Sequence, residues 1–412
     1  MKRFVLAALT VVLCAGLASP PSQAQTVISG RGGGGAYYQI IVPDAWNGDL
    51  VIWNHGFSLN PIAPNPDLGP LVDLQVAEGY AVAASSYRQI GWAVFKTKND
   101  LQNLYNKFVK RFGHPNQVLV YGASLGGIVT AAAIEKAHIG NVVGAFPFCG
   151  AVAGSRNWDG ALDFRLLYDN FCADVPGAYI PGGAEGLPED SDLTLEDTYG
   201  AVDTCFGLIS PPGRTQEQQE RLDGFLAISQ IPESFILDDI GFFGTFGMSD
   251  LVHSKTKLNG KLGTGNASVD YGDPLVNATI ERVEPNPGAA NRFEKNYTPT
   301  GFVGDVKIVS MHTDKDGIVL VENQHEYAEV VPAANLTTAI VVEEVPTHCG
   351  FTGAELVAGW EALRGWVAGD PQPSAAAIQF LCQAIEGQDF PGPCRIDPDF
   401  VVPDMDGRVR PR

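Results

Sequence analysis

The chain changes character abruptly at Ser124, and this change constrains its fold more than any other feature. An apolar run at residues 118–121 leads into Gly122-Ala123-Ser124-Leu125-Gly126, and an alanine-rich run follows at residues 128–137. The first run is typical of a buried strand and the second of a helix. The small residues around Ser124 permit a sharp turn between them. A strand that passes directly into a helix is expected in a sheet that helices cover.

Other apolar runs repeat this alternation along the chain. The predicted strands are residues 37–42, 50–53, 80–85, 118–121, 142–148, 306–310 and 338–342. The clearest predicted helices between and after them are residues 98–112, 128–137 and 353–367. The pattern predicts an α/β fold with a mostly parallel sheet flanked by helices. With 412 residues, 45% of them hydrophobic, the chain can form one large domain or two.

Residues 150–302 interrupt the alternation. They are rich in Gly, Pro, Asp and aromatic residues, and they separate two predicted strands that would otherwise be neighbours. A loop of this length without its own structure is not expected, so helices such as residues 216–228 should form in it. We predict an inserted cap or lid region here, a core made of residues 25–149 and 303–370, and a C-terminal extension at 371–412 with a helix near 374–385.

The N-terminus is typical of a secretory signal peptide. Lys2 and Arg3 precede an apolar run at residues 4–17, and the small residues Ser22 and Ala24 follow. The run is shorter than the roughly 20 residues that a membrane span needs. Cleavage after Ala24 is therefore predicted, with a secreted product that is extracellular or periplasmic and has no stable membrane insertion. A lipid anchor on Cys14 is the alternative, but the preceding Leu13 is bulky where such sites have a small residue.

The charge of the chain argues against two classes of partner. The formal net charge is −20, and loss of Lys2 and Arg3 with the signal peptide would make it −22. A strongly acidic protein repels nucleic acid and anionic lipid, so neither is an expected partner. Solubility outside the cell is a sufficient reason for this acidity.

Six cysteines would remain after cleavage, which in an exported chain predicts three disulfides. They are Cys149, Cys172, Cys205, Cys349, Cys382 and Cys394. Cys382 and Cys394 flank a Gly-Pro turn, and Cys172 and Cys205 both fall in the inserted region, which leaves Cys149 with Cys349. The sequence alone leaves the other pairings open.

Residues 122–126 match the pattern G-x-S-x-G, with an apolar strand before it and a helix after it. In a chain with 47 glycines such a short motif can also arise by chance. With its flanking elements, the motif resembles the nucleophile turn of the α/β-hydrolase superfamily, and the likeness runs from about residue 37 to 367 apart from the insertion. This resemblance implies an α/β-hydrolase fold with Ser124 as nucleophile. It also implies an acid and then a histidine on loops after later strands.

The loop after the predicted strand 306–310 resembles the acid turn of that superfamily, in which the carboxylate stands three residues before a Val. With Val319 as that Val, the resemblance selects Asp316, and Asp314 is the neighbouring candidate. A calcium loop is another interpretation of Asp314-Lys315-Asp316-Gly317. The spaced acids and terminal glutamate of a full calcium loop are missing, however.

His348 follows the predicted strand 338–342, at the position where the superfamily has its base. A histidine suits this role because its pKa lies near neutral pH, so it can take the serine proton and return it to the leaving group. The remaining histidines precede the acid, adjoin it or fall in a predicted helix. They are His55, His114, His138, His253, His312 and His325.

The two oxyanion donors are expected from backbone amides. One is the N–H of Leu125, directly after the nucleophile. The segment Asn54-His55-Gly56-Phe57 resembles the superfamily's His-Gly turn, so the N–H of Phe57 is the predicted second donor. The choice between Gly56 and Phe57 stays open, and His55 is expected to brace the loop.

Aromatic residues in the inserted region are candidates for the substrate pocket. Phe242, Phe243 and Phe246 are expected to line an apolar pocket beside Ser124, and Trp92 is a further candidate. Packing in the core is the alternative for all four. The sequence carries no phosphate loop, metal-ligand cluster or cofactor motif, so no cofactor is expected.

The resemblance implies a secreted serine hydrolase that cleaves carboxylic esters, either small molecules or polymers, through an acyl-enzyme. A secreted serine peptidase is the alternative, since Ser86-Tyr87-Arg88 and Trp92 faintly resemble prolyl peptidases. A third hypothesis is a non-catalytic binding module on a hydrolase scaffold. No sequence signal specifies the leaving group or the oligomeric state.

Overall fold

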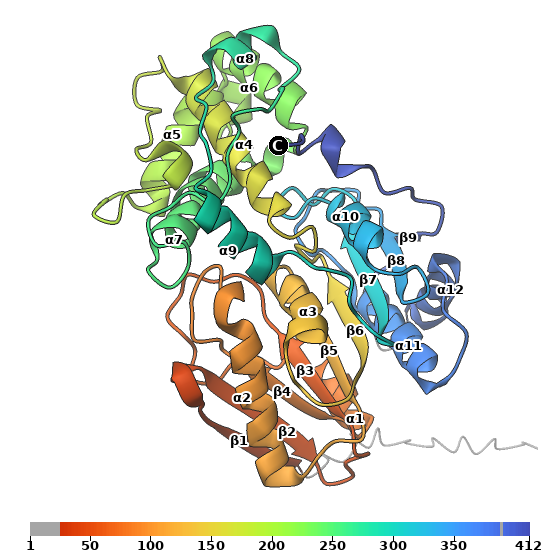
Figure 1. Cartoon of the computed structure of the whole chain (residues 1–412). Coiled ribbons are helices and arrows are strands. Elements are labelled where there is room, and N and C mark those ends of the chain that lie inside the picture. Colours follow the sequence, from red (N-terminus) through yellow and green to blue (C-terminus); the bar gives the residue numbers. More distant parts are fainter. Residues whose placement is uncertain (1–24, 388–389) are drawn as a thin grey trace, which may run out of the picture.

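The computed structural model describes residues 25–387 and 390–412 (Figure 1). The predicted signal peptide, residues 1–24, lies outside the described residues. No helix in the described ranges is both long and apolar enough to span a membrane.

One sheet forms the centre of the molecule. Its nine strands within the described ranges lie in the order β1-β2-β4-β3-β5-β6-β7-β8-β9. Their bounds are β1 Gln25–Arg31, β2 Tyr37–Pro43, β3 Leu50–Asn54, β4 Ala81–Ser85, β5 Val118–Ala123, β6 Val142–Phe148, β7 Lys307–Thr313, β8 Leu336–Val341 and β9 Ile396–Asp397. The strands from β4 to β8 pair in parallel, while β1, β2 and β9 pair antiparallel at the edges.

Every predicted strand is present, and the sheet has two more strands that the sequence analysis missed. β1 is largely exposed and pairs only with β2, so it lacks the apolar run of a buried strand. β9 is two residues long. Both are edge strands that exist because a neighbouring strand offers them hydrogen bonds.

Helices cover both faces of the sheet. On one face lie α2 Val94–Phe112, α3 Leu125–Lys136 and α10 Asn323–Val330, and on the other lie α1 Val72–Ala77, α11 Gly353–Ala368 and α12 Ala375–Ile385. A strand between two helical layers has no solvent-facing side. All five residues of β3 are accordingly buried.

The predicted insertion, residues 150–302, connects β6 to β7, which are direct neighbours in the sheet. Figure 1 shows it as a helical lobe at the carboxyl ends of these strands. Its main elements are α4 Arg156–Cys172, α5 Leu195–Phe206, α6 Gln216–Ser229, the π-helix η5 Leu237–Gly247, α7 Met248–His253, α8 Pro274–Thr279 and α9 Pro287–Tyr297. One apolar core runs from the sheet into this lobe and includes Trp158 and Leu162. The insertion is therefore packed onto the core.

The C-terminal extension returns to the insertion. α12 packs beside α11, β9 joins the sheet edge, and the last residues cross to the helical lobe (Figure 1). There Arg412 pairs with Asp163 at 3.0 Å, and Arg156 pairs with Asp406 at 2.7 Å.

The three predicted disulfides are confirmed. Cys149 is bonded to Cys349, Cys172 to Cys205, and Cys382 to Cys394. The first joins residues 200 positions apart in the sequence.

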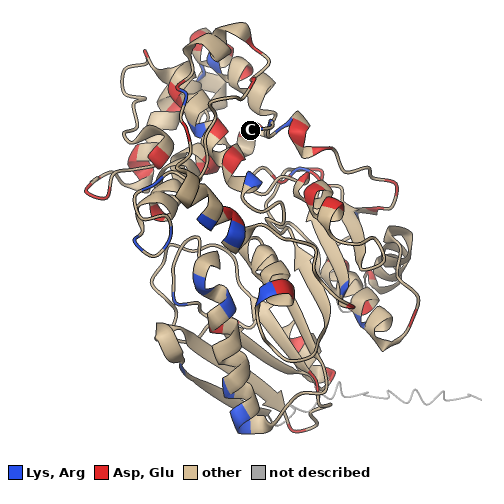
Figure 2. Ribbon diagram, in the orientation of Figure 1, with Lys and Arg blue, Asp and Glu red and all other residues tan. Residues whose placement is uncertain are grey.

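Charged side chains are spread over many elements. Figure 2 shows Asp and Glu both in the helical lobe and around the sheet, with basic residues recurring along α2. The acidic charge is therefore distributed over the molecule and does not form a single stripe.

Candidate active site

Ser124 occupies a strained turn between β5 and α3. β5 ends at Ala123 and α3 begins at Leu125, so Ser124 alone makes the turn, with φ 57° and ψ −124°. A non-glycine residue with positive φ is uncommon and often marks a functional site. A Cβ on Gly122 would overlap the carbonyl oxygen of Gly126, and a Cβ on Gly126 would overlap that of Asn54. The turn therefore requires glycine at both positions.

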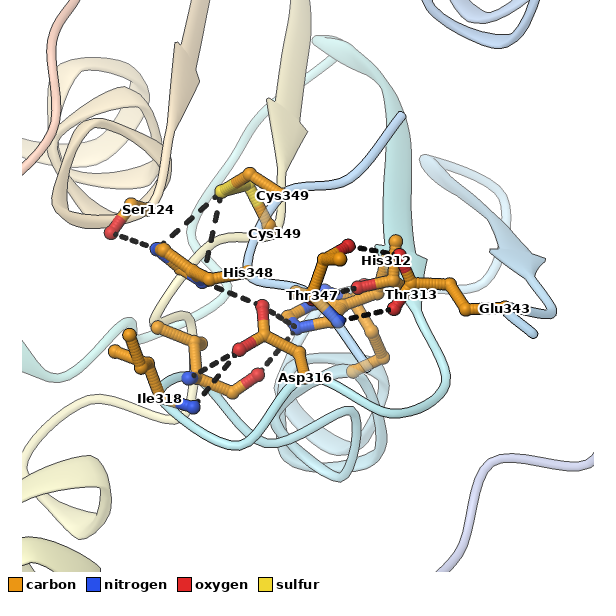
Figure 3. The surroundings of a disulfide bond; sticks show 12 residues. Ser124, Cys149, His312, Thr313, Asp316, Ile318, Glu343, Thr347, His348 and Cys349 are labelled. Carbon is orange, nitrogen blue, oxygen red and sulfur yellow. Dashed lines mark hydrogen bonds and ion pairs between the residues drawn. A yellow bond between two sulfur atoms is a disulfide. The ribbon is translucent and has the colours of Figure 1, made fainter. Parts of the chain in front are cut away.

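Two loops bring Asp316 and His348 to Ser124. The first follows β7 and the second follows β8. His348 Nε2 lies 2.9 Å from Ser124 Oγ, and His348 Nδ1 lies 2.7 Å from Asp316 Oδ2. Figure 3 shows the imidazole between the hydroxyl and the carboxylate. The structure thus brings together the three residues that the sequence predicts as nucleophile, base and acid.

Asp316 is fully buried and is held by its own turn. Its Oδ1 accepts hydrogen bonds from the amides of Ile318 and Val319, both at 3.0 Å. This leaves Oδ2 for His348. Asp314, the alternative acid, accepts the amide of Glu343 at 2.8 Å and does not contact the imidazole.

A second buried histidine supports the acid turn. His312 Nε2 donates to the carbonyl of Val319 at 2.7 Å, and Nδ1 accepts from the Gln324 amide at 3.0 Å. Burial lowers the pKa of His312, which favours this neutral form. Its Nε2 is 3.8 Å from Asp316, so it packs behind the carboxylate without competing for Oδ2.

Opposing effects act on the pKa of His348. Burial lowers the pKa, but the charge and hydrogen bond of Asp316, together with the charges of Asp238 and Glu343, raise it above the usual histidine value. An imidazolium ion at this position is therefore stabilised by its surroundings. This is the form that a histidine base takes after it accepts a proton.

A disulfide anchors the histidine loop. Cys349 directly follows His348 and is bonded to Cys149, which directly follows β6 (Figure 3). The sulfur of Cys349 lies 3.5 Å from His348 Nε2. Asp316, His348 and Cys349 are close enough to share a metal ion, but a disulfide sulfur cannot bind as a thiolate. The bond ties His348 to the strand beside the serine turn.

The loop after β3 also reaches Ser124. A Cβ on Gly56 would lie 3.5 Å from the Cβ of Ser124, so this backbone passes directly beside Ser124. Phe57 and Leu125 line the same pocket as Ser124. Within the described ranges, no hydrogen-bond acceptor is recorded for either amide. His55 donates from Nδ1 to the Gly56 carbonyl at 2.8 Å and stacks on Tyr87, which braces the loop.

Ser124 lies in a pocket whose walls are mainly apolar side chains. Trp92 and Phe243 line it, but Phe242 and Phe246 are not among its lining residues. Side chains that follow one another on a helix point in different directions. Phe242 instead packs edge-on against Phe57 and beside Phe246.

Other residues of the pocket carried no recognisable sequence signal. Trp158, Phe164 and Asp239 come from the insertion, and Met405 comes from the C-terminal extension. Each lies far from Ser124 in the sequence and outside any motif, so only the packing of these segments brings them to the pocket.

The strand order, the helical layers and the serine turn between β5 and α3 define an α/β-hydrolase fold, as the sequence predicts. No protein-family model matches the chain, and no curated protein matches its sequence.

Among solved structures, the chain is similar to Candida antarctica lipase A in its closed state, with 11% identity, a TM-score of 0.43, and coverage of 88% of this chain and 86% of that one. It is also similar to an esterase from a Rhodococcus species, with 13% identity and a TM-score of 0.39. That match covers 83% of this chain and 98% of the esterase. A third similar structure is the acylaminoacyl peptidase of Pyrococcus horikoshii, with 10% identity and a TM-score of 0.40. That match covers 88% of this chain and 40% of the peptidase.

Proposed function

We propose that this chain is a secreted serine hydrolase that cleaves carboxylic esters, with Ser124, His348 and Asp316 as its catalytic triad. The hydrogen-bond chain from Ser124 Oγ through the imidazole to the Asp316 carboxylate carries the proposal. This arrangement activates a serine hydroxyl in unrelated folds, because the histidine accepts the proton and the acid orients the ring.

In the first half of the reaction, Ser124 Oγ attacks the ester carbonyl carbon while its proton passes to His348 Nε2. Asp316 stabilises the resulting imidazolium and keeps the Nδ1 proton directed at itself. The oxyanion accepts hydrogen bonds from the backbone amides of Leu125 and Phe57. The carbon–oxygen bond to the alcohol then breaks, and His348 gives its proton to the departing oxygen.

In the second half, water releases the acyl group from Ser124. His348 takes a proton from the water as its oxygen attacks the acyl carbon, and a second tetrahedral oxyanion forms at the same two amides. When this intermediate collapses, the proton returns to Ser124 Oγ and the carboxylic acid leaves. The enzyme is then in its starting state.

The pocket supports an ester with an apolar portion as substrate. Its walls include Phe57, Trp92, Trp158 and Phe164. Such a lining binds a hydrocarbon or aromatic group through the hydrophobic effect. Trp158 and Phe164 belong to the insertion, so we assign this region the role of a cap that shapes the acyl or alcohol site.

Secretion of the protein is part of the proposal. Its support is the signal-type N-terminal sequence, together with three disulfides, which form and persist in oxidising compartments.

Labelling with a fluorophosphonate probe and hydrolysis of 4-nitrophenyl esters test the proposal. Ser124→Ala is expected to abolish labelling and to lower turnover by about 10⁶-fold, as triad removal does in an unrelated serine enzyme. Ser268→Ala is the matched control, because Ser268 is exposed on the insertion. Labelling of Ser124→Ala would contradict the assignment.

The same assay separates the rival hypotheses. Cleavage of peptide amides in preference to esters would indicate a serine peptidase. A folded protein that neither reacts with the probe nor cleaves esters or amides would be a non-catalytic binding module.

A further inference from the structure

The apolar pocket beside Ser124 contains a carboxylic acid. Asp239 lies on η5 and lines the pocket together with Ser124, Trp92 and Phe243. It is 4% exposed. Among the described residues that line this pocket, it is the one acidic side chain. The triad described above does not use it.

Asp239 lacks a protein partner in the described part of the chain. No hydrogen bond to its carboxylate is recorded there, and its Oδ2 is buried without a partner. Arg408 acts on Asp239 through its charge, but it forms its ion pair with Glu322 at 3.2 Å. The neighbouring Asp238 is different, since it accepts the hydroxyl of Tyr199.

A buried carboxyl group without a partner is unfavourable, so it calls for an explanation. Burial raises the pKa of Asp239 well above its usual value, and the charges of Asp316 and Asp238 raise it further. The negative charges of two further acids thus act on Asp239. A positively charged group beside Asp239 would offset this repulsion and would supply the missing hydrogen bonds.

The walls of the pocket also suit a cation. Trp92 and Trp158 meet edge to face at 5.2 Å between ring centroids, and Phe57 and Phe243 meet at 5.4 Å. Aromatic rings attract an ammonium ion through their negative faces and also accept the hydrocarbon chain that carries it. The lining of one pocket thus offers both aromatic rings and an acid to an alkylammonium group.

We propose that this pocket selects esters that carry an alkylammonium group, and that Asp239 is the specificity-determining residue that binds it. The inference rests on the proposed ester hydrolysis at Ser124. The ammonium group donates hydrogen bonds to the Asp239 carboxylate, while its alkyl chain lies against the aromatic walls. The group can belong to the acyl part or to the alcohol part of the ester, and the experiment distinguishes these two sources.

Two matched substrate pairs test the proposal. The 4-nitrophenyl esters of 6-aminohexanoic and heptanoic acid differ at the end of the acyl chain, where one has an ammonium and the other a methyl group. The acetate esters of 6-aminohexanol and heptanol make the same comparison on the alcohol side. We expect kcat/KM to favour the ammonium member of one pair by about 10- to 100-fold, the range of a hydrogen bond to a charged group.

Three forms of the protein are compared at one pH: the parent, Asp239→Asn and Asp223→Asn. Asp239→Asn should bring the ratio of kcat/KM between the ammonium and the neutral member of the pair close to one. Asp223→Asn removes the same charge from an exposed position on α6, which is not among the residues lining the pocket, so the preference should persist. Retention of the preference in Asp239→Asn, or its equal loss in both variants, would overturn the proposal.

A binding measurement keeps the test independent of the variants. Hexylammonium should protect Ser124 of the parent from fluorophosphonate labelling at a concentration at least roughly tenfold lower than hexanol, if the pocket binds the cation. Equal protection would overturn the proposal even if Asp239→Asn fails to fold. If the parent hydrolyses the neutral esters but shows no ammonium preference, this inference fails and ester hydrolysis stands. If no ester is hydrolysed and no labelling occurs, the proposed function fails.

Discussion

Asp314 and Asp316 stand two positions apart in one loop but have different partners. Asp316 contacts His348, whereas Asp314 binds the backbone of the loop that carries His348. Asp316 therefore acts on the imidazole ring of His348, whereas Asp314 acts on the backbone of the loop that holds it. Replacing each acid in turn distinguishes the residue that contacts the imidazole from the residue that supports the loop.

We expect Asp316→Asn to lower kcat by about 10⁴-fold, because an amide stabilises the wrong tautomer of the imidazole. Asp314→Asn should cost far less, since an amide oxygen can still accept the Glu343 amide. Initial rates with a 4-nitrophenyl ester measure both effects, with circular dichroism as the folding control. Equal losses in two folded variants would mean that Asp316 is not the orienting acid.

The raised pKa of His348 predicts where activity is lost in acid. A general base must be unprotonated, so activity should fall as the pH falls through a pKa that lies above the usual value of about 6.5. Asp238→Asn removes one of the charges that raise this pKa and should move the acid limb to lower pH. The exposed Asp223→Asn is the control. A pH–rate profile of kcat/KM that is identical in all three proteins would refute this account.

At the scale of elements, η5 brings aromatic side chains to the edge of the candidate active site. Phe243 lines the pocket and Phe242 does not, although they are adjacent in the sequence. Both rings contact Phe57. The helix can thus influence selectivity through one residue while the next contributes to packing.

Phe243→Ala should change the ratio of rates for long and short acyl esters by roughly tenfold, within the 1–3 kcal/mol that a pocket contact contributes to discrimination. Phe242→Ala should leave this ratio nearly unchanged and serves as the matched control. The measurement is kcat/KM across a series of 4-nitrophenyl esters. Labelling of Ser124 by a small probe should be similar in both variants. An unchanged chain-length profile in Phe243→Ala would place the acyl site elsewhere.

At the scale of the whole molecule, distant segments converge on one site. The insertion supplies Trp158, the C-terminal extension supplies Met405, and Cys149 is bonded to Cys349 beside the histidine. Arg412 and Arg156 add ion pairs between the extension and the insertion. The site is therefore completed only when both segments have packed onto the sheet.

The Cys149–Cys349 bond should contribute to activity as well as to stability. Replacing both cysteines with Ala frees the loop of His348, and a misplacement of the base by about 1 Å can cost roughly 10²-fold in rate. The pair Cys382 and Cys394 is the control, because it joins α12 to the chain before β9 and neither cysteine adjoins Ser124, Asp316 or His348 in the sequence. For a given loss of unfolding free energy, removal of the Cys149–Cys349 bond should lower kcat much more than removal of the Cys382–Cys394 bond. An equal effect of the two removals would assign both bonds a purely structural role.

The sequence by itself determined the features that depend on neighbouring residues. The turn at Ser124 needs glycine on both sides, because a side chain there would overlap the backbone of the helix or of the β3 loop. Alternating apolar runs predicted the buried strands for the same local reason. The positions of Asp316 and His348 followed from the order in which loops succeed strands in the α/β-hydrolase fold.

Only the tertiary structure decided which residues form the pocket. Asp239 and Met405 belong to segments with no motif, and their placement depends on how the insertion and the extension pack against the sheet. The same packing turned Phe243 toward the pocket and left Phe242 outside its lining, and pairing with a neighbouring strand formed β1 and β9. Such contacts join residues far apart in the chain, and side-chain packing is set by the shape of both partners, which no local pattern encodes.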